Sequence, residues 1–335
     1  MTLTVVLFLL PLSFIASAFL AHWKEGLLTR ALYVCSSLWL GVGLTLLTAF
    51  GLAWAAWGAT KVLHQDPTPA WFGWAAVGLT FLYSTYGVFN AYHPRLVDFT
   101  VRLKNLPAAW RGKTVVQLSD VHLGRILGVD FLTRVVGWVN AQNPAMVLIT
   151  GDLFDGARGN LEKLVAPINR LAAPQGIYFA TGNHETYLGV ERAYEALRTT
   201  PVRVLDNERV EIDGLQVIGI SFPERGQPSS FGEKMAKLQG FDPALPSILL
   251  YHSPSQVAEA KAAGISLQLS GHVHQGQLFP LQFITRLIFG KYYHGLHVEG
   301  DYTVYTSSGT GVWGPTMRTG NHPEIAVINL EEART

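Results

Sequence analysis

The sequence contains little cysteine and carries almost no net charge. Cys35 is the only cysteine among 335 residues, which excludes intramolecular disulfide bonds and argues against thiol redox chemistry. The formal net charge is only +1. This argues against a general nucleic-acid-binding protein, because such proteins carry a strong positive balance. Internal repeats and low-complexity tracts are also absent from the sequence.

Charged residues are nearly missing from the first 94 positions in particular. The whole chain has 15% charged residues, below the ~25% that is usual for soluble domains. Up to position 94 the charged residues are Lys24, Glu25, Arg30, Lys61 and Asp66. The chain is therefore expected to consist of a membrane part followed by a water-soluble part.

Three runs without a charged residue lie in this first part, at 1–21, 31–60 and 70–92. Each reaches the ~20 apolar residues that a helix needs to cross the hydrocarbon core of a bilayer. Trp and Tyr cluster toward several of their ends, as they do at membrane interfaces. We therefore predict three transmembrane helices within residues 1–92. The first run contains "ASA", which resembles a signal-peptide cleavage site, but it lacks the basic start of such signals, so a span is favoured.

Basic residues around these runs predict the orientation in the membrane. The loop after the first run carries Lys24 and Arg30, whereas the loop after the second carries Lys61 alone. Further basic residues follow the third run, namely Arg95, Arg102, Lys104, Arg111 and Lys113. Because basic loops stay in the cytoplasm, we expect an integral inner (cell) membrane protein with a cytoplasmic C-terminal domain at 113–335. A short linker at 93–112, with prolines at 94 and 107, would join the two parts.

The soluble part alternates between short apolar runs and longer helix-compatible stretches, which predicts an α/β fold. The apolar runs are "TVVQLSD", "AMVLITGD", "GIYFATGN", "SILLYHS" and "ISLQLSGHVH". They are typical of buried strands, since both faces are apolar. Helices are predicted at 128–142, 159–172, 188–199 and 255–263, and a hairpin with its turn at Asp213-Gly214.

Each of these apolar runs ends in residues that can bind a metal. In chain order they are Asp120 and His122, then Asp152, then Asn183 and His184, then His252, and finally His272 and His274. One such residue after a strand is usually a helix cap or a turn residue. All five strand ends together predict a shared site, because ligands bind beyond the carboxyl ends of strands in α/β sheets. Carboxylate, amide and imidazole donors suit Mn, Fe or Zn, and their number indicates two ions with Asp152 as the simplest bridge.

The ordered blocks "DVH", "GDLFD", "GNHE", "YHS" and "GHVH" resemble the signature of calcineurin-like metallophosphoesterases. The resemblance covers about 114–330. Within that superfamily the chain is most similar to bacterial membrane-associated phosphoesterases, on the segments "GHVHQGQ" and "SSGTGVWGPTMR". That subfamily includes enzymes that act on lipids. The protein Ser/Thr phosphatase pattern is not met, since Gly156 stands where that pattern has an arginine.

The resemblance implies a four-layer αββα sandwich and a site with two divalent metal ions, with Mn favoured and Fe or Zn as alternatives. By block, Asp120, His122 and His274 would hold one ion, and Asn183, His252 and His272 the other, with Asp152 bridging. His184 would be the catalytic histidine, Asp155 would orient it, and Arg318 would bind the substrate phosphate.

The expected function is that of a membrane-anchored phosphohydrolase that cleaves a phosphodiester or pyrophosphate bond by attack of a hydroxide bridging two metals. A lipid-linked substrate is favoured, and the bilayer is the expected partner, with no nucleic acid and no obligate protein partner. A phosphodiesterase of soluble or cyclic nucleotides is the alternative, and a non-enzymatic metal-binding scaffold is a third possibility. The apolar segment 278–295 either packs on the domain core or forms an interfacial helix beside the site, with Phe283 and Leu287 on one face.

Overall fold

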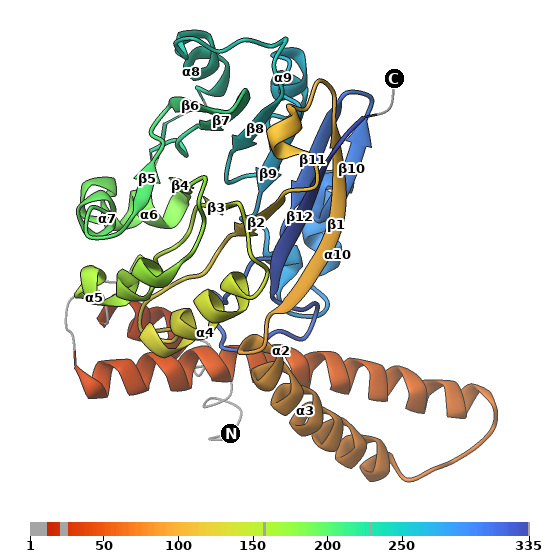
Figure 1. The fold of residues 1–335 in the computed structure, drawn as a ribbon. Helices are drawn as coiled ribbons and strands as arrows, with labels where there is room; N and C mark the ends of the chain where they lie inside the picture. Colours follow the sequence, from red (N-terminus) through yellow and green to blue (C-terminus); the bar gives the residue numbers. More distant parts are fainter. Residues whose placement is uncertain (1–11, 21–25, 157–158, 225, 228–229, 334–335) are drawn as a thin grey trace.

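The computed structural model describes residues 12–20, 26–156, 159–224, 226–227 and 230–333. Figure 1 shows a domain of strands and short helices above two long helices, α2 (Leu27–Val62) and α3 (Pro69–Ala91). The domain contains everything that positions the candidate site.

Two six-stranded sheets form the centre of this domain. The first has the order β1 (Arg95–Leu103), β12 (Glu324–Glu332), β2 (Thr114–Leu118), β3 (Met146–Thr150), β4 (Ile177–Ala180) and β5 (Val202–Val204). The second has the order β10 (Gly295–Glu299), β11 (Tyr302–Thr306), β9 (Leu267–Ser270), β8 (Ser247–Leu250), β7 (Leu215–Gly219) and β6 (Glu208–Ile212). Strands β2 to β5 are parallel, as are β7, β8, β9 and β11, so their carboxyl ends share one edge of each sheet.

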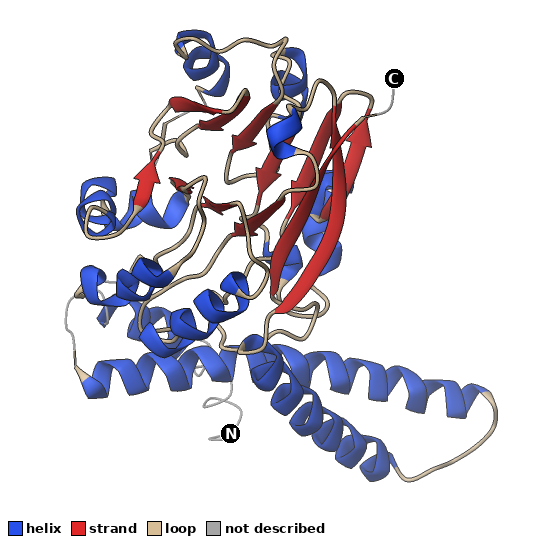
Figure 2. Cartoon of the chain, viewed as in Figure 1, coloured by secondary structure: helices blue, strands red, loops and turns tan. Residues whose placement is uncertain are grey.

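The two sheets pack face to face because successive residues of a strand point to opposite sides. Val115 of β2 and Leu250 of β8 belong to the apolar core between the sheets. The next residue along β2, Val116, points the other way and packs with helix residues such as Val135. Figure 2 shows the strands with helices on both outer sides. The layers are therefore helix, sheet, sheet and helix, as predicted.

Short helices connect the strands. The outer face of the first sheet carries α4 (Val129–Asn140), α5 (Leu161–Val165), α6 (Asn183–Leu188) and α7 (Val190–Leu197), and that of the second carries α8 (Phe231–Lys237) and α9 (Val257–Ala262). Single 3-10 turns are η1 (Ala108–Trp110), η2 (Ala166–Arg170), η3 (His274–Gly276) and η4 (Gly290–Tyr293). The four predicted helical stretches and the β6–β7 hairpin are confirmed.

The linker predicted at 93–112 is not a free connection, because it contains the strand β1. This strand pairs in parallel with β12, from Arg95 beside Glu324 to Leu103 beside Glu332. Val101 and Leu103 are buried in the core between the sheets. The partner strand lies near the far end of the sequence, so the local composition around β1 could not indicate the pairing. The C-terminal domain thus begins at β1, directly after α3.

The prediction of three membrane spans is also corrected. Among the described residues one helix, α2, is long and apolar enough to cross a membrane, and it contains the predicted run 31–60. The run 70–92 forms α3, which is not among the helices that meet this criterion. Of the run 1–21, residues 12–20 are helical, and the rest lies outside the described residues.

The second half of α3 packs on the C-terminal domain instead of lying free. The Asn90 side chain donates to the carbonyl oxygens of Arg318 and Asn321 at 2.9 and 2.7 Å. The backbone N–H of Arg318 donates to the carbonyl of Gly87 at 2.9 Å. The second half of α3 therefore serves as a docking face for the loop 315–321.

The segment 278–295 contains a helix, α10 (Gln282–Phe289), that has no buried residue. Phe283 is 61% exposed and Leu287 is 86% exposed. The two alternatives for this segment therefore apply to different parts of it: Leu278 and Tyr292 pack on the domain, whereas α10 exposes Phe283 and Leu287.

Candidate metal centre

The strand ends bring the predicted ligands together at one edge of the two sheets. Asp120 and His122 follow β2, Asp152 follows β3, and Asn183 opens α6 after β4. His252 follows β8, and His272 and His274 follow β9. These side chains are buried, apart from His272, which is half-buried. Apart from Asn183, they form three overlapping groups that could hold a metal ion, and one of these groups includes His184 beside His122 and Asp152.

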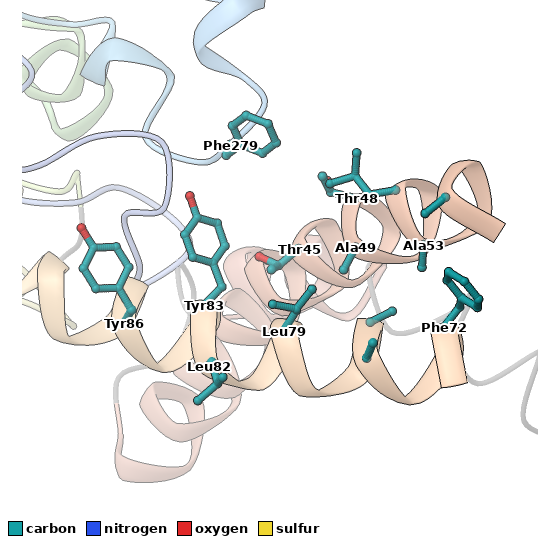
Figure 3. A pocket seen from close by; sticks show the side chains of 14 residues that line it. Thr45, Thr48, Ala49, Ala53, Phe72, Leu79, Leu82, Tyr83, Tyr86 and Phe279 are labelled. Atoms are coloured by element: carbon teal, nitrogen blue, oxygen red, sulfur yellow. The ribbon is translucent and has the colours of Figure 1, made fainter. Parts of the chain in front are cut away.

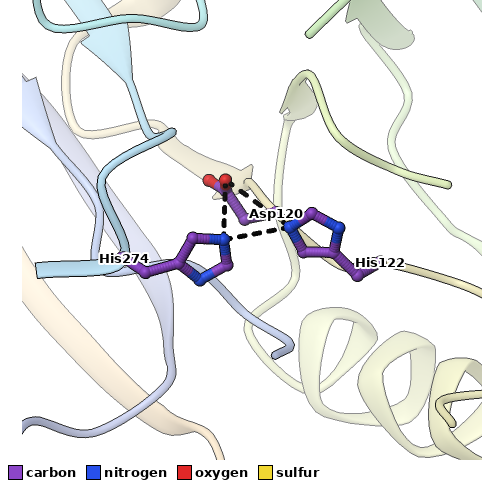
Figure 4. A group of neighbouring side chains, drawn as sticks. All are labelled: Asp120, His122 and His274. Atoms are coloured by element: carbon purple, nitrogen blue, oxygen red, sulfur yellow. Dashed lines mark hydrogen bonds and ion pairs between the residues drawn. The ribbon is translucent and has the colours of Figure 1, made fainter. Parts of the chain in front are cut away.

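Asp120, His122 and His274 form the first group (Figure 4). His274 Nε2 lies 3.3 Å from Asp120 Oδ1 and 3.0 Å from His122 Nε2. His122 Nε2 is 3.9 Å from the same carboxylate oxygen. Two ring nitrogens and one carboxylate oxygen therefore point at a common position, as predicted for the first ion.

Asp152, His252 and His272 form the second group. His252 Nε2 lies 3.1 Å from Asp152 Oδ2 and 3.2 Å from Asn183 Oδ1. The other ring nitrogen, Nδ1, bonds the carbonyl of Thr150 at 2.7 Å, which aims Nε2 at the group. Asn183 thus joins the second group through its amide oxygen.

Asp152 lies between the two groups. Its Oδ2 is 3.8 Å from His122 Nε2 on one side and 3.1 Å from His252 Nε2 on the other. Its Oδ1 accepts a hydrogen bond from the backbone N–H of His184 at 2.8 Å. One oxygen is therefore held by the backbone while the other faces both groups, which is the position that a bridging ligand requires.

The backbone around the site is strained. Five of the candidate ligands have a left-handed backbone, with φ of 52° at Asp120, 52° at His122, 50° at Asp152, 73° at His272 and 47° at His274. This region is uncommon for residues other than glycine and costs about 1–3 kcal/mol each. Such strain clusters where a site needs side chains in fixed directions. The left-handed backbone at these five residues therefore serves to orient their metal-binding side chains.

Two glycines in the sequence blocks are required for the close approach of loops. A Cβ on Gly182 would lie 2.2 Å from Asp152 Oδ1, and a Cβ on Gly271 would lie 2.1 Å from Asp120 Oδ2. Neither position can accept a larger residue unless a metal-facing carboxylate moves. The glycines of "GNHE" and "GHVH" are thus part of the site although they carry no ligand atom.

Three of the histidines are neutral at pH 7. Burial lowers the pKa of His122 and of His274 well below the usual value, and nearby cations or histidines lower them further. Burial and the adjacent His252 lower the pKa of His272 to about 4. Neutral imidazole offers a lone pair, which is the form that binds a metal.

His252 and Asp152 form an ion pair instead. Burial alone would lower the pKa of His252, but the carboxylates of Asp152 and Asp120 raise it to about 10. Burial alone would raise the pKa of Asp152, but His252 and the other histidines hold it far below its usual range. A positive charge is therefore stabilised between these carboxylates.

The donor set fits divalent cations. His122 Nε2 and His274 Nε2 face each other at 3.0 Å although both rings are neutral, so at most one of these nitrogens can donate to the other. Three imidazole lone pairs, the carboxylates and one amide oxygen match the preference of Mn, Fe or Zn. The residues of this chain thus fit a divalent metal site, and the number of ions and the identity of the metal stay predictions.

The predicted catalytic pair is arranged differently from the expectation. His184 lies in the site with His122 and Asp152, and its ring centre is 4.6 Å from that of His122 in a T-shaped arrangement. Its Nδ1 is buried and has no hydrogen-bond partner among the described residues, so Asp155 does not hold this nitrogen. The Asp155 carboxylate lies 3.9 Å from His122 Nδ1 instead, and burial raises its pKa to about 8. Asp155 is therefore placed behind a ligand of the first group.

Arg318, predicted to bind the substrate phosphate, is fully buried. Its guanidinium donates to the carbonyl of Gly311 at 2.6 Å and to Asn321 Oδ1 at 2.7 Å, and its Nη2 lies 3.0 Å from His274 Nδ1. All sides of the guanidinium are thus in contact with the protein. The geometry places Arg318 behind His274, and not at the surface that a substrate reaches.

Glu185 is a site residue to which the sequence analysis assigned no role. Its buried carboxylate accepts hydrogen bonds from the backbone N–H groups of Asp152, Phe154 and Gly182, at 2.9, 3.1 and 2.8 Å. It thereby ties the loop after β3 to the loop after β4. Its bond to the N–H of Gly182 is one half of a capping box, and the glutamate three residues after Gly182 in "GNHE" is the signal that could have indicated it.

An apolar cavity of about 560 Å³ opens beside the site. His272 and His274 lie at one side of it, and its other walls include Leu40 and Leu44 of α2 and Ile284 of α10. A helix from the N-terminal part and the exposed helix α10 therefore both border the metal-binding residues.

Comparison with known families identifies the domain. The family model for calcineurin-like phosphoesterases matches residues 113–276. A metallophosphoesterase of Aquifex aeolicus is 31% identical over 256 residues, which cover 75% of this chain and 97% of that protein. The chain belongs to the calcineurin-like metallophosphoesterase family. The resemblance drawn from the sequence blocks is confirmed, and the expected class, metal-dependent phosphoester hydrolase, is that of the family.

Other metallophosphoesterases are similar over much of the chain. A zebrafish protein called "transmembrane protein with metallophosphoesterase domain" is 35% identical over 278 residues, covering 77% of this chain and 62% of that protein. A Campylobacter jejuni metallophosphoesterase is 32% identical over 241 residues, covering 71% of this chain and 63% of that protein. The chain thus spans less than two thirds of the length of these two relatives. Among solved structures, TT1561 of Thermus thermophilus is similar with a TM-score of 0.40 and 13% identity, over 59% of this chain and 89% of that one.

Proposed function

We propose that this metallophosphoesterase is anchored in the membrane and hydrolyses a phosphodiester or pyrophosphate bond in a lipid-linked substrate. The observation that carries the proposal is the apolar cavity of about 560 Å³ that has His272 and His274 in its wall. A substrate with an apolar tail can fill this cavity while its phosphate lies at the metal-binding residues. A small hydrophilic substrate would leave these apolar walls without a contact.

The helices that form the walls of this cavity also expose apolar side chains on the outer surface of the protein. Leu40 and Leu44 belong to α2, the candidate membrane helix, and Leu281, Ile284 and Phe289 lie in or beside α10. On the outer side of α10, Phe283 and Leu287 are exposed. An amphiphilic helix with such a face lies in the interfacial region of a bilayer. Together these elements form a path from the lipid phase to the metal-binding residues.

A second apolar groove supports this arrangement. It has a volume of about 670 Å³ and runs between α2 and α3, where Thr45, Leu79 and Tyr83 line it (Figure 3). Phe279, from the segment before α10, borders the same groove. The apolar surface therefore continues from the long helices to the segment beside the metal centre, as expected if a bilayer covers both.

The chemistry follows from the donor set. Bound divalent ions, with Mn favoured, would supply a hydroxide nucleophile at neutral pH and offset the charge on the phosphoryl oxygens. The protein residues hold and move protons around this step. His184, at the edge of the site, protonates the leaving oxygen as a general acid. Asp152 and Asp120 keep the centre anionic, so that it attracts cations.

The membrane setting is proposed from the helices and the basic residues. α2, with α3 packed beside it, anchors the chain in the inner (cell) membrane. The basic residues Arg95, Arg102 and Lys104 lie in or directly after β1, which follows α3. Because such residues near a membrane helix stay in the cytoplasm, the catalytic domain faces the cytoplasm.

The test compares lipid and soluble substrates on the same enzyme. The full chain, purified in detergent and supplied with Mn²⁺, is assayed on a long-chain lipid pyrophosphate and on bis-p-nitrophenyl phosphate. We expect Leu44→Asp and Ile284→Asp to lower kcat/KM for the lipid about tenfold or more, since burial of one such side chain contributes about 1.5–3 kcal/mol. Hydrolysis of the soluble diester should change little.

Val298→Asp provides the control, because Val298 is an exposed apolar residue of β10 that does not line the cavity. Equal losses on both substrates would assign Leu44 and Ile284 to folding alone. A wild type that is equally efficient on short soluble and long lipid substrates would remove the support for a lipid tail.

One observation favours the alternative, a phosphodiesterase of soluble or cyclic nucleotides. Tyr187 and Trp313 are partly exposed, and their rings lie 5.3 and 5.7 Å from the ring of His184. Aromatic side chains at this position can stack on a nucleobase. The same assay distinguishes the two functions when a nucleotide diester is included, because Ile284→Asp would leave nucleotide turnover intact.

A further inference from the structure

A separate cavity of about 740 Å³ lies where the start of α2 meets α4. None of the candidate metal ligands lines it. Four basic side chains and one acidic side chain do, namely Arg30, Arg125, Arg134, Lys163 and Asp130. The cations come from α2, from the loop after His122, from α4 and from α5, so four separate elements direct positive charge to one place.

Protein carboxylates do not neutralise most of this charge. Within the described part of the chain, no ion pair involves Arg30, Arg134 or Lys163. Arg134 lies over the ring of Phe131 at 5.8 Å, and Arg125 over that of Tyr33 at 5.9 Å. Contacts of this kind hold a guanidinium in place without cancelling its charge. Like charges that share a cavity repel one another, so an anion entering it lowers the electrostatic energy.

The backbone adds to the positive potential. Both α2 and α4 begin at the wall of the cavity, after Gly26 and Gly128, and no side chain of the residues that the structure describes caps either first turn. The N–H groups at the start of a helix favour negative charge. Asp130, in the first turn of α4, supplies only one carboxylate against the four cations.

The edge of the cavity beside these cations is apolar. Leu27 and Leu28, at the start of α2, are 87% and 74% exposed. Leu27 lines the cavity together with Ile126 and Leu164. The helix that carries Leu27, Leu28 and Arg30 is also the one that can cross a membrane. Cations next to exposed leucines match the headgroup and the acyl chains of an anionic lipid, whereas a free phosphate ion would leave the leucines unused.

We infer that this cavity binds the phosphodiester headgroup of an anionic phospholipid. Arg30 and Arg134 bind the phosphate oxygens, Lys163 adds a further positive charge, and Leu27 and Leu28 contact the acyl chains. The bound lipid holds the start of α2 against α4 at the surface of the bilayer. The site is distinct from the metal centre, so the inference does not depend on the substrate proposed above.

The test measures lipid retention and not catalysis. The full chain in a mild detergent is mixed with equal amounts of dioleoylphosphatidylglycerol and dioleoylphosphatidylcholine, which share their acyl chains. Bound lipid is then identified by native mass spectrometry. We expect the wild type to prefer phosphatidylglycerol, and the triple variant Arg30→Gln/Arg134→Gln/Lys163→Gln to lose this preference by about tenfold or more, since each basic residue near a membrane surface contributes about 1 kcal/mol.

A matched control removes three exposed cations elsewhere, with Lys113→Gln, Arg198→Gln and Lys237→Gln. This variant should keep the preference, and metal content should be unchanged in both variants, which shows that each has folded. Equal preference in the two triple variants would overturn the site. Displacement of phosphatidylglycerol by millimolar inorganic phosphate alone would overturn the lipid assignment and leave a site for free phosphate.

Discussion

At the scale of single residues, neighbouring histidines of the centre have different surroundings. His272 shares one group with Asp152 and His252, which are both held in place by further contacts. His184 stands at the edge of the centre, where its ring meets those of His122, Tyr187 and Trp313. We predict that the buried His184, next to the exposed rings of Tyr187 and Trp313, meets the leaving group, and that His272 binds a metal.

These positions predict different losses on substitution. His184→Ala should lower turnover of bis-p-nitrophenyl phosphate about 10²–10⁴-fold, the range of general acid–base catalysis, while the metal content stays at the wild-type value. His272→Ala should lose metal as well as activity. Elemental analysis of both purified variants distinguishes these outcomes. Loss of metal from His184→Ala would make His184 a ligand instead.

The charge state of His252 predicts that metal binding releases protons. Burial lowers its pKa, but Asp152 and Asp120 raise it to about 10, so His252 is protonated at pH 7 when no metal is bound. Coordination needs the free lone pair, so Mn²⁺ binding at pH 7 should release about one proton from this residue, and affinity should rise as pH rises toward 10. Calorimetry in two buffers of different ionisation enthalpy measures the release.

His252→Gln is the control for this experiment, since glutamine has no proton to lose and should reduce the release accordingly. The same proton count for the variant and the wild type would mean that the protons come from another group, and the proposed charge state of His252 would then be wrong.

At the scale of elements, the glycines of α2 and α3 show how the long helices dock. A Cβ on Gly41 would lie 2.6 Å from Met317 Sδ, and one on Gly87 would lie 2.6 Å from Thr319 Cγ2. Gly43 and Gly78 lie in the same two helices, and a Cβ on either would meet no atom within 4 Å. The loop 315–321 therefore packs against one glycine of each helix.

Enlarging these contact glycines should separate the helices from the loop. Gly41→Leu and Gly87→Leu should each destabilise the protein by about 1–3 kcal/mol through overpacking, which lowers Tm in a thermal unfolding experiment. Gly43→Leu and Gly78→Leu should be neutral or slightly stabilising, because glycine is a poor helix former. If the control variants lose as much stability as the contact variants, the helices are not docked in this way.

Elements also show how far the sequence could predict the structure. The ligands were predictable because each directly follows an apolar run, so a local pattern identifies both the strand and the polar residue at its end. The strand β1 was not predictable, because it pairs with β12 at the other end of the chain and prolines flank its own sequence. Burial of Arg318 and the three backbone contacts of Glu185 depend on loops that meet only in the folded domain.

At the scale of the whole molecule, the long helices and the metal centre are parts of one structure. Only residues 92–94 separate α3 from β1, and β1 is paired along its entire length with β12. α2 contributes Leu40 and Leu44 to the cavity that also contains His272 and His274. The catalytic domain is therefore held in a fixed orientation to α2, and any bilayer around α2 would lie at the open side of this cavity.

The central claim is that the strand ends build a two-metal centre with Asp152 between the ions. The most direct measurement is elemental analysis of the purified full chain after reconstitution with Mn²⁺, for the wild type and for Asp152→Asn. We predict about two ions per chain in the wild type and a clear reduction in the variant, because the substitution removes the charge that both groups share. One ion or fewer in the wild type, unchanged by Asp152→Asn, would contradict the assignment.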